Sequence, residues 1–221
     1  MNPRRLIGGL LPLLVVSLAW SAIAQETSAS ATAEEREAHY AQALERRVDR
    51  IFERLKIEDA AKASRVRTLL LLQYRTLRAR DEVINAQLRA AGKDPDDYAA
   101  RAELRLRLSK PLHEWFVSIL ALELTPAQLE AVKDVMTYDK VRVTADAYAQ
   151  IIPALKDADK AWIVERLKAA REEAMDGGSA NEKSHIFQKH KDAINAELTA
   201  RGYDVAKAYQ DWEARQAAAG K

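Results

Sequence analysis

Two clusters of polar side chains could bind or transform a ligand in this chain. The first comprises Tyr138, Asp139, Lys140 and Arg142, in a stretch that breaks the helical periodicity. Loops held by a rigid scaffold are where binding residues concentrate. The second cluster follows a glycine pair and contains Lys183, His185, Lys189, His190 and Asn195. If the clusters meet, they form a basic, aromatic-lined pocket suited to an acidic ligand or a sugar; otherwise Tyr138 packs and the charges are solvated.

Patterns typical of metal sites and nucleophilic catalysis are missing from the sequence. His185 and His190 are five residues apart, so on a helix they point about 140° away from each other. His113-Glu114 lacks the second histidine of the zinc-protease motif, and no Gly-x-Ser-x-Gly occurs. The chain has no cysteine, which excludes thiol catalysis and thiolate metal sites. We therefore expect no metal ion and no other cofactor.

Two further patterns have simple structural explanations. A glycosidase needs two acids across a cleft, and spacing along a helix cannot show that, so Glu172-Glu173 is interpreted as ordinary helix surface. Gly177-Gly178 lacks the lysine and the preceding strand of a phosphate-binding loop. The glycine pair therefore predicts the C-cap of a helix.

The N-terminus has the features of a secretory signal peptide over residues 1–24. Arg4 and Arg5 precede an apolar run from Leu6 to Trp20, and Ser21–Ala24 supplies the small residues of a cleavage site. Residues 25–33 are small and polar and predict a flexible mature N-terminus. We therefore expect export, either to the periplasm or to the extracellular space.

The charge balance narrows the classes of partner. The chain carries 35 Lys and Arg against 33 Asp and Glu, and cleavage after residue 24 would remove two arginines and no acid. A neutral, finely mixed charge pattern argues against nucleic-acid binding and against a polybasic membrane anchor. No second stretch approaches the roughly 20 apolar residues of a membrane helix. An oligosaccharide or a protein remains as the expected partner, and the oligomeric state stays open.

Apolar residues recur at steps of three and four along most of the remaining chain, which predicts helices. Capping boxes fit Thr32 with Glu35, Thr125 with Gln128, and Ser179 with Glu182. Asp59 and Asp204 are predicted N-caps as well. The sum is an all-α, bundle-like domain of seven or eight helices over residues 34–215, with short loops and a frayed tail at 216–221.

Two segments carry more specific expectations. Pro111 predicts a kink or a restart in a helix that begins near Pro95, with Ser109 as a new cap. The predicted buried face of that helix consists of Leu104, Leu108, Leu112, Trp115, Ile119 and Leu122. Residues 137–144 alternate β-branched and polar side chains and predict an extended linker, after which Thr144 caps the next helix.

Several segments resemble a family of exported bacterial helical proteins catalogued as a domain of unknown function, whose genes tend to lie among plant-polysaccharide utilisation systems. The most specific matches are Met136–Asp139 and Ala170–Ser179; others are Ala33–Glu37, Ala63–Val66, Glu123–Gln128 and Arg201–Asp204. The resemblance implies an all-α fold, export and a role in glycan use, and it brings no established reaction. The family has a Lys-Gly-Arg group where this chain has His190–Ala193, so the resemblance does not support a basic site at residues 189–193.

A second, weaker resemblance is to periplasmic stress chaperones with Leu-Thr-x-x-Gln repeats. Leu124–Gln128 matches once, and Ile57–Ala61 is a poor second copy. Three hypotheses follow. The favoured one is an exported, non-catalytic accessory protein that binds a glycan fragment or a partner protein. The alternatives are an enzyme acting on acidic oligosaccharides, with Tyr138 or His185 as acid or base, and a holdase-type chaperone.

Overall fold

All the regular secondary structure of the described residues is helical. The computed structural model describes residues 32–220, so the predicted leader and residues 25–31 lie outside the described part of the chain. Within that part there are eight helices and no strand, which confirms the all-α class. The helices are α2 (Ala33–Leu55), α3 (Ala60–Ala90), α4 (Tyr98–Glu123), α5 (Pro126–Met136), α6 (Lys140–Ile151), α7 (Asp157–Met175), α8 (Ala180–Ala200) and α9 (Val205–Ala218).

The chain divides into two units between Ala43 and Leu44, inside α2. The first unit contributes only the start of α2 to the described residues. There, Thr32 and Glu35 form the predicted capping box, each side chain accepting a hydrogen bond from the other residue's backbone N–H. The second unit, which starts at Leu44, contains the other helices and both apolar cores.

Most predicted helix starts are confirmed by their capping bonds. Thr125 and Gln128 form a complete capping box, and Asp59 and Asp204 each accept from the backbone N–H three residues on. Ser179 accepts from the N–H of Glu182, but the Glu182 carboxylate turns to Gly178 and completes no box. These bonds satisfy N–H groups that have no partner inside the helix.

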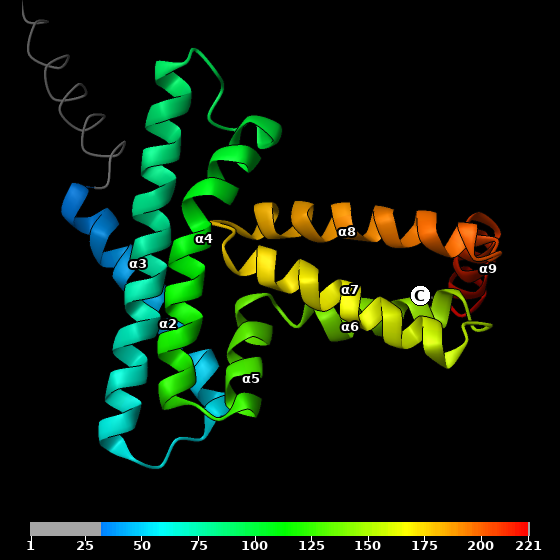
Figure 1. Cartoon of the computed structure of the whole chain (residues 1–221), viewed down its shortest axis with the longest axis horizontal. Coiled ribbons are helices and arrows are strands. Elements are labelled where there is room, and N and C mark those ends of the chain that lie inside the picture. The colour runs from blue at the N-terminus through cyan, green and yellow to red at the C-terminus, as the bar shows by residue number, and fades with distance from the viewer. Residues whose placement is uncertain (1–31, 221) are drawn as a thin grey trace, which may run out of the picture. The chain divides into compact units, whose positions relative to one another are not determined.

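The first core lies among α2, α3, α4 and α5. Helices α3 and α4 form a hairpin whose turn includes Gly92, at φ +67°, and α4 runs back along α3 (Figure 1). An ion pair between Arg65 and Glu123 joins the far end of this hairpin. The apolar cluster of this core comprises Val48, Ile51, Leu55, Val66, Leu70, Phe116, Leu120, Leu124, Val132, Met136 and Met175.

The second core lies among α6, α7, α8 and α9. Helices α7 and α8 form another hairpin, and α6 packs along α7 (Figure 1). The apolar cluster includes Tyr148, Ile163, Leu167, Phe187 and Ile194. Because α7 contributes Met175 to the first core and Leu167 to the second, it belongs to both halves of the unit.

The restart predicted at Pro111 does not occur, whereas the alternative prediction of a kink there stays a prediction. Helix α4 starts at Tyr98, capped by Asp97, and continues through Pro111 to Glu123. Pro111 lies on the exposed side, where water can serve the Arg107 carbonyl that loses its helical partner. Ser109 caps nothing; it is buried, and its hydroxyl accepts a hydrogen bond from Arg80 at 2.6 Å.

The predicted extended linker at residues 137–144 is also wrong. The segment is a short turn in which Tyr138 and Asp139 both have positive φ, at 59° and 54°, and α6 begins directly at Lys140. Thr144 is therefore a helix-interior residue and not a cap. Val141 is buried in the second core, and this packing outweighs the weak helix propensity of a β-branched residue.

The predicted buried face of α4 is shifted around the helix. The residues buried there are Arg105, Ser109, Phe116 and Leu120, whereas Trp115 is 43% exposed and Leu122 is 83% exposed. Periodicity predicted a helix correctly, but two polar residues occupy core positions and an apolar face remains outside.

At the other end of the unit, α9 continues to Ala218, past the predicted end at residue 215.

Candidate functional site

The first predicted cluster does not form a pocket of its own. Asp139 accepts two hydrogen bonds from the guanidinium of Arg54, at 2.8 and 2.5 Å. Tyr138 is about half exposed, and Arg142 is exposed beside Asp146, one helical turn away. The side chain of Lys140 turns instead toward α8, where its Nζ lies 5.8 Å from the centre of the Phe187 ring.

The second predicted cluster is dispersed along α8. Asn195 accepts a hydrogen bond from the Tyr148 hydroxyl at 2.8 Å, inside the second core. His190 lies 3.1 Å from the carboxylate of Glu173, and Lys189 approaches the same oxygen at 3.6 Å. Among the described residues, no hydrogen bond or ion pair joins a member of one cluster to a member of the other; Lys140 reaches α8 at Phe187, which belongs to neither. Of their members, only His185 lines either of the two pockets described below.

Lys183 is the most buried cation of the second cluster. Its Nζ lies 3.4 Å from the backbone carbonyl of Met175, and its side chain is almost fully enclosed. Burial lowers its pKa to about 8, although Asp176 opposes the shift. Lys183 is therefore a buried side chain in the first turn of α8, in contact with the end of α7.

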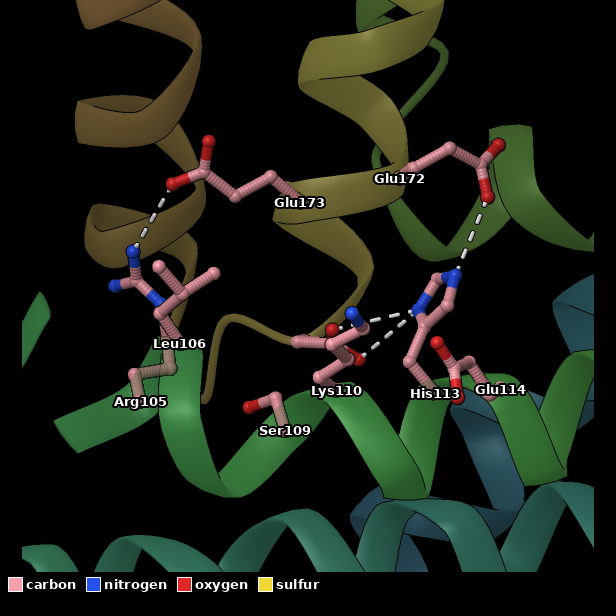
Figure 2. Close-up of a pocket in the computed structure, with 9 residues that line it drawn as sticks. Arg105, Leu106, Ser109, Lys110, His113, Glu114, Glu172 and Glu173 are labelled. Carbon is pink, nitrogen blue, oxygen red and sulfur yellow. Dashed lines mark hydrogen bonds and ion pairs between the residues drawn. The ribbon is translucent and has the colours of Figure 1, made fainter. Parts of the chain in front are cut away.

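A pocket of about 270 Å³ lies between α4 and α7, and we call it the charged pocket (Figure 2). Its lining residues are Arg105, Leu106, Ser109, Lys110, His113, Glu114, Glu172, Glu173 and Asp176. His113 extends from α4 toward Glu172 on α7, and Arg105 extends toward Glu173 (Figure 2). The charged pocket is therefore lined by ion pairs between side chains of α4 and side chains of α7.

His113 is held between two carboxylates. Its Nδ1 lies 3.3 Å from Asp176, and its Nε2 lies 3.4 Å from Glu172. The hydrogen bonds to Asp176 and Glu172 raise the pKa of His113 to about 9. Burial opposes ionisation of Glu172, but the hydrogen bonds to His113 and Lys133 outweigh it and lower the pKa of Glu172 to about 2. At neutral pH the protonated imidazole of His113 and the ionised carboxylate of Glu172 form a charged link between α4 and α7.

Arg105 connects the charged pocket to a second one. Its Nη1 donates to Glu182 at 2.7 Å and its Nη2 to Glu173 at 3.3 Å, and only 3% of the residue is exposed. Burial opposes ionisation of Glu182, but the hydrogen bonds from Arg105 and from the Gly178 N–H outweigh it and lower its pKa. The guanidinium therefore stabilises carboxylates on both α7 and α8.

The second pocket, of about 570 Å³, lies where the α3–α4 turn meets the start of α8, and we call it the polar pocket. It is lined by Asp81, Asn85, Asp96, Tyr98, Arg101, Gly178, Ser179, Asn181, Glu182 and His185. The rings of Tyr98 and His185 lie 4.9 Å apart, tilted by 31°. Arg101 donates hydrogen bonds to the side chain of Asn85 and to the carbonyl of Pro95.

Asp81 is an acid of the polar pocket whose pKa lies above its ordinary value. Burial raises its pKa, and the negative charge of Glu182 adds to that shift, while Arg80 opposes it. Arg80, itself 3% exposed in its side chain, lies 2.7 Å from the Asp81 carboxylate. Asp81 and Glu182 therefore have pKa values displaced in opposite directions within one pocket.

The glycine pair serves close packing, so the prediction of a glycine C-cap is wrong. Asp176 is the C-cap of α7, and neither Gly177 nor Gly178 has positive φ. A Cβ atom on Gly178 would lie 1.7 Å from Oδ2 of Asp81, and one on Gly177 would lie 2.9 Å from Cγ of Lys183. The Gly-Gly turn lets the α7–α8 connection lie directly against the Asp81 carboxylate.

Sequence reasoning missed the residues that matter most in these pockets. Glu172 and Glu173, interpreted as surface charge, are partly enclosed and paired across helices. Arg105 on α4 and Asp81 on α3 belong to no recognisable sequence motif. Their burial could have been inferred only from their positions next to the buried faces of these helices. The segment Ala170–Ser179, which carries the family resemblance, did point to this region.

Over residues 32–220, no three His, Asp or Glu side chains are grouped so as to hold a metal ion, and no helix has the length and apolar character of a membrane span.

Comparison with known proteins identifies a family without identifying an activity. The family model described as "Protein of unknown function (DUF3826)" matches residues 41–218, which is most of the chain. No curated protein matches at a significant level. The matched range includes every residue of both pockets. The chain therefore belongs to the DUF3826 family of proteins of unknown function.

Proposed function

We propose that this protein binds a neutral glycan fragment in the polar pocket. The observation that carries the proposal is the lining itself, in which planar hydrogen-bonding groups surround an aromatic pair. Asp81, Asn85, Arg101, Asn181 and Glu182 supply carboxylate, amide and guanidinium groups, which can donate to or accept from vicinal hydroxyls. The rings of Tyr98 and His185 offer an apolar surface for the face of a sugar ring.

The size of the pocket supports a small oligosaccharide. Its volume of about 570 Å³ lies within the range of roughly 300–1,000 Å³ that is usual for small-molecule sites. The charged pocket, at about 270 Å³, lies below that range, and its arginine and histidine already have carboxylate partners. The polar pocket is therefore the better candidate of the two.

The charge of the polar pocket favours a neutral ligand over an acidic one. Asp81, Asp96 and Glu182 line it together with one arginine, Arg101, which already approaches Asp81 and Glu182. A uronate would find no uncommitted guanidinium to pair with, because Arg80, Arg101 and Arg105 already approach Asp81 and Glu182. We therefore propose neutral oligosaccharides in place of the acidic ones that the sequence suggested.

Export and a role in polysaccharide utilisation are part of the proposal. The apolar run at residues 6–20 with its small-residue cleavage site supports a secretory leader. The resemblance to exported bacterial proteins encoded beside polysaccharide-degrading systems supports the glycan context. An accessory protein outside the cytoplasm would meet the products of such systems as neutral and acidic fragments.

Isothermal titration calorimetry tests the proposal with cellobiose, xylobiose, galactobiose and digalacturonate. We expect at least one neutral disaccharide to bind and digalacturonate to bind at least tenfold more weakly. Tyr98→Ala should reduce the affinity at least tenfold through loss of the ring surface. Tyr138→Ala, an exposed tyrosine outside the pocket, is the matched control and should bind as wild type does. Absence of binding by all four sugars, or equal losses in both variants, would contradict the proposal.

A second candidate function is glycoside hydrolysis in the same pocket. The observation that favours it is the pair Asp81 and Glu182, since a raised and a lowered carboxyl pKa is the arrangement of a general acid with a base or nucleophile. Prolonged incubation with the same neutral sugars and chromatography of the products tests it. Asp81→Asn should abolish turnover while binding persists. If wild type yields no product from any of these sugars, the binding function stands alone.

A further inference from the structure

Four ionisable side chains touch one another in sequence across three helices, and we call them the ion-pair chain. Its members, in order, are His190, Glu173, Arg105 and Glu182. Nε2 of His190 lies 3.1 Å from Oε2 of Glu173, and the other carboxylate oxygen of Glu173 lies 3.3 Å from Nη2 of Arg105. Nη1 of Arg105 donates to Glu182 at 2.7 Å. The ion-pair chain therefore connects a histidine that lines neither pocket to a carboxylate of the polar pocket.

Little water reaches the inner half of the ion-pair chain. The side chains of Arg105 and Glu182 are 4% and 8% exposed, and those of Glu173 and His190 are half-buried. Charges act on one another more strongly where water is excluded than they do at a solvated surface. A change of charge at one link can therefore alter the next.

Arg105 is shared between two carboxylates, and the sharing is unequal. Its contact with Glu182 is shorter than its contact with Glu173, at 2.7 Å against 3.3 Å. Figure 2 shows the guanidinium extending from α4 toward Glu173 on α7. Movement of the guanidinium toward one carboxylate lengthens its contact with the other. Arg105 is therefore an element with two arrangements, which coupling between separate positions in a protein requires.

His190 affects how strongly Glu173 competes for Arg105. The hydrogen bond to His190 lowers the pKa of Glu173; burial opposes this shift, and the charges of Lys189 and Arg105 add to it. Of the described side chains that act on this carboxylate, only the imidazole is of a type that ordinarily changes its charge between about pH 5 and 8. A protonated His190 supplies Glu173 with a cation of its own, whereas a neutral His190 leaves Glu173 more dependent on Arg105.

Glu182 receives the effect at the other end. One of its carboxylate oxygens accepts from Arg105 and the other accepts from the Gly178 N–H, at 2.7 Å. Along α8, His190 is eight residues from Glu182, which corresponds to about 12 Å and is long compared with these contacts. The path through α7 and α4 is therefore the stronger one. The other charged groups that act on Glu182 are Arg101, Asp81 and Lys183.

We propose that His190 is a positioning residue that makes the polar pocket responsive to pH. When His190 is protonated, it holds Glu173, and Arg105 stays with Glu182, which remains ionised and in place to accept from a ligand hydroxyl. When His190 loses its proton, Glu173 draws Arg105 away from Glu182, and ligand binding weakens. This effect on binding rests on the proposed function, whereas the coupling itself belongs to the unliganded protein.

Nuclear magnetic resonance of the unliganded protein tests the coupling. The chemical shift of the Gly178 amide reports changes at Glu182, because this N–H donates to its carboxylate. Between about pH 5.5 and 7.5 we expect the Gly178 signal to move with the same midpoint as the His190 ring. His190→Gln should hold the signal near its high-pH position. Glu173→Gln should hold it near its low-pH position, because Arg105 then has Glu182 as its one carboxylate partner.

The opposite limits of these two variants separate coupling from a merely structural role, which would move both signals in one direction. His185→Gln is the matched control, since it removes the histidine of the polar pocket and no member of the ion-pair chain. In this control the transition at Gly178 should persist. Lys183 does not interfere, because its pKa of about 8 lies above the range. Circular dichroism melts confirm that each variant is folded.

Three outcomes would overturn the proposal. These are a Gly178 signal that does not follow His190, a transition that survives Glu173→Gln, and displacement of both variants in the same direction. Calorimetry with a neutral disaccharide then tests the effect on binding. His190→Gln should weaken binding at least threefold at the low end of the pH range and leave it unchanged at the high end; equal effects at both ends would contradict the regulation. If no sugar binds, the proposed function fails while the resonance result still decides the coupling.

Discussion

The charged pocket and the polar pocket share the Arg105–Glu182 contact but use their charges differently. In the charged pocket, each of Arg105, His113 and Glu172 has a partner on another helix, so the charges hold α4 against α7. In the polar pocket, amides, a hydroxyl and two rings accompany the ion pairs, and they keep hydrogen-bonding capacity for a ligand. A high density of charged side chains therefore does not by itself locate a binding site. A binding site needs groups that can still form hydrogen bonds with a ligand after the hydrogen bonds and ion pairs within the protein have formed.

The largest effect should come from removing the guanidinium of Arg105, which lines the charged pocket and binds Glu182 of the polar pocket. Arg105→Met would leave the carboxylates of Glu173 and Glu182 without their buried cation, and breaking a buried pair costs about 3–5 kcal/mol. Urea unfolding monitored by circular dichroism measures the loss. If the free energy of unfolding falls by less than about 1 kcal/mol, the shared contact does not hold the two pockets together.

The pH dependence of stability should reveal the histidine of the charged pocket. The pKa of His113 is raised from about 6.5 to about 9 in the folded state, so its contribution is fully present below pH 6.5 and is lost as the pH rises through 9. The expected contribution is on the order of 3 kcal/mol. His113→Asn should lack this loss, so wild type and variant should converge above pH 9. Using their difference cancels Lys183, whose lowered pKa has the opposite effect above pH 8. A constant difference from pH 6 to 10 would contradict the assignment.

Filling the space beside Asp81 should disturb the polar pocket without touching the charged one. In Gly178→Ala the new methyl group would clash with Oδ2 of Asp81, and overpacking of this kind costs about 1–3 kcal/mol. Ligand binding should fall as well, because Asp81 lines the pocket. Adding Asp81→Ala should recover part of the stability, since it removes the clashing oxygen. If the double variant is no more stable than the sum of the single effects, the two residues are not in contact.

The smallest effect should be at the first predicted cluster. Arg142 is exposed and faces Asp146 one helical turn away, at 3.5 Å. Surface pairs of this kind contribute little, so Arg142→Ala should stay within about 2 °C of the wild-type Tm and should not change ligand binding. Thermal melts and the calorimetric titrations check both expectations. A marked loss of binding would restore residues 138–142 as part of the site and would weaken the case for the polar pocket.

Helix identity was predictable wherever local chemistry determines it. Thr125, Asp59 and Asp204 cap helices as their side chains and sequence neighbours predict, because a capping bond involves atoms only two or three residues apart. The turn at Tyr138 and Asp139 was not predictable in the same way. Its β-branched neighbours favour extended structure, and only burial of Val141 against the second core makes the helix the better solution.

The candidate site was predictable to a smaller extent. His185 was a candidate and lines the polar pocket. Its partner Tyr98 lies 87 positions earlier in the chain and Asp81 lies 104 positions earlier, and no shared motif connects them to Glu182 or His185. Glu172 and Glu173 look like surface charge because a helix of alternating charge is usually solvated. Their partners, His113 and Arg105, come from a helix more than 50 residues earlier in the chain.

The sequence by itself determined the all-α class, most helix starts and the DUF3826 relationship, since these depend on periodicity, on capping bonds and on residue identity along the chain. Tertiary structure alone decided which face of α4 is buried, that Gly178 lies directly against the Asp81 carboxylate, and which charges are paired. Those outcomes depend on desolvation and on contacts between helices. The residues that pack opposite a carboxylate decide whether it is a solvated surface group or part of a pocket.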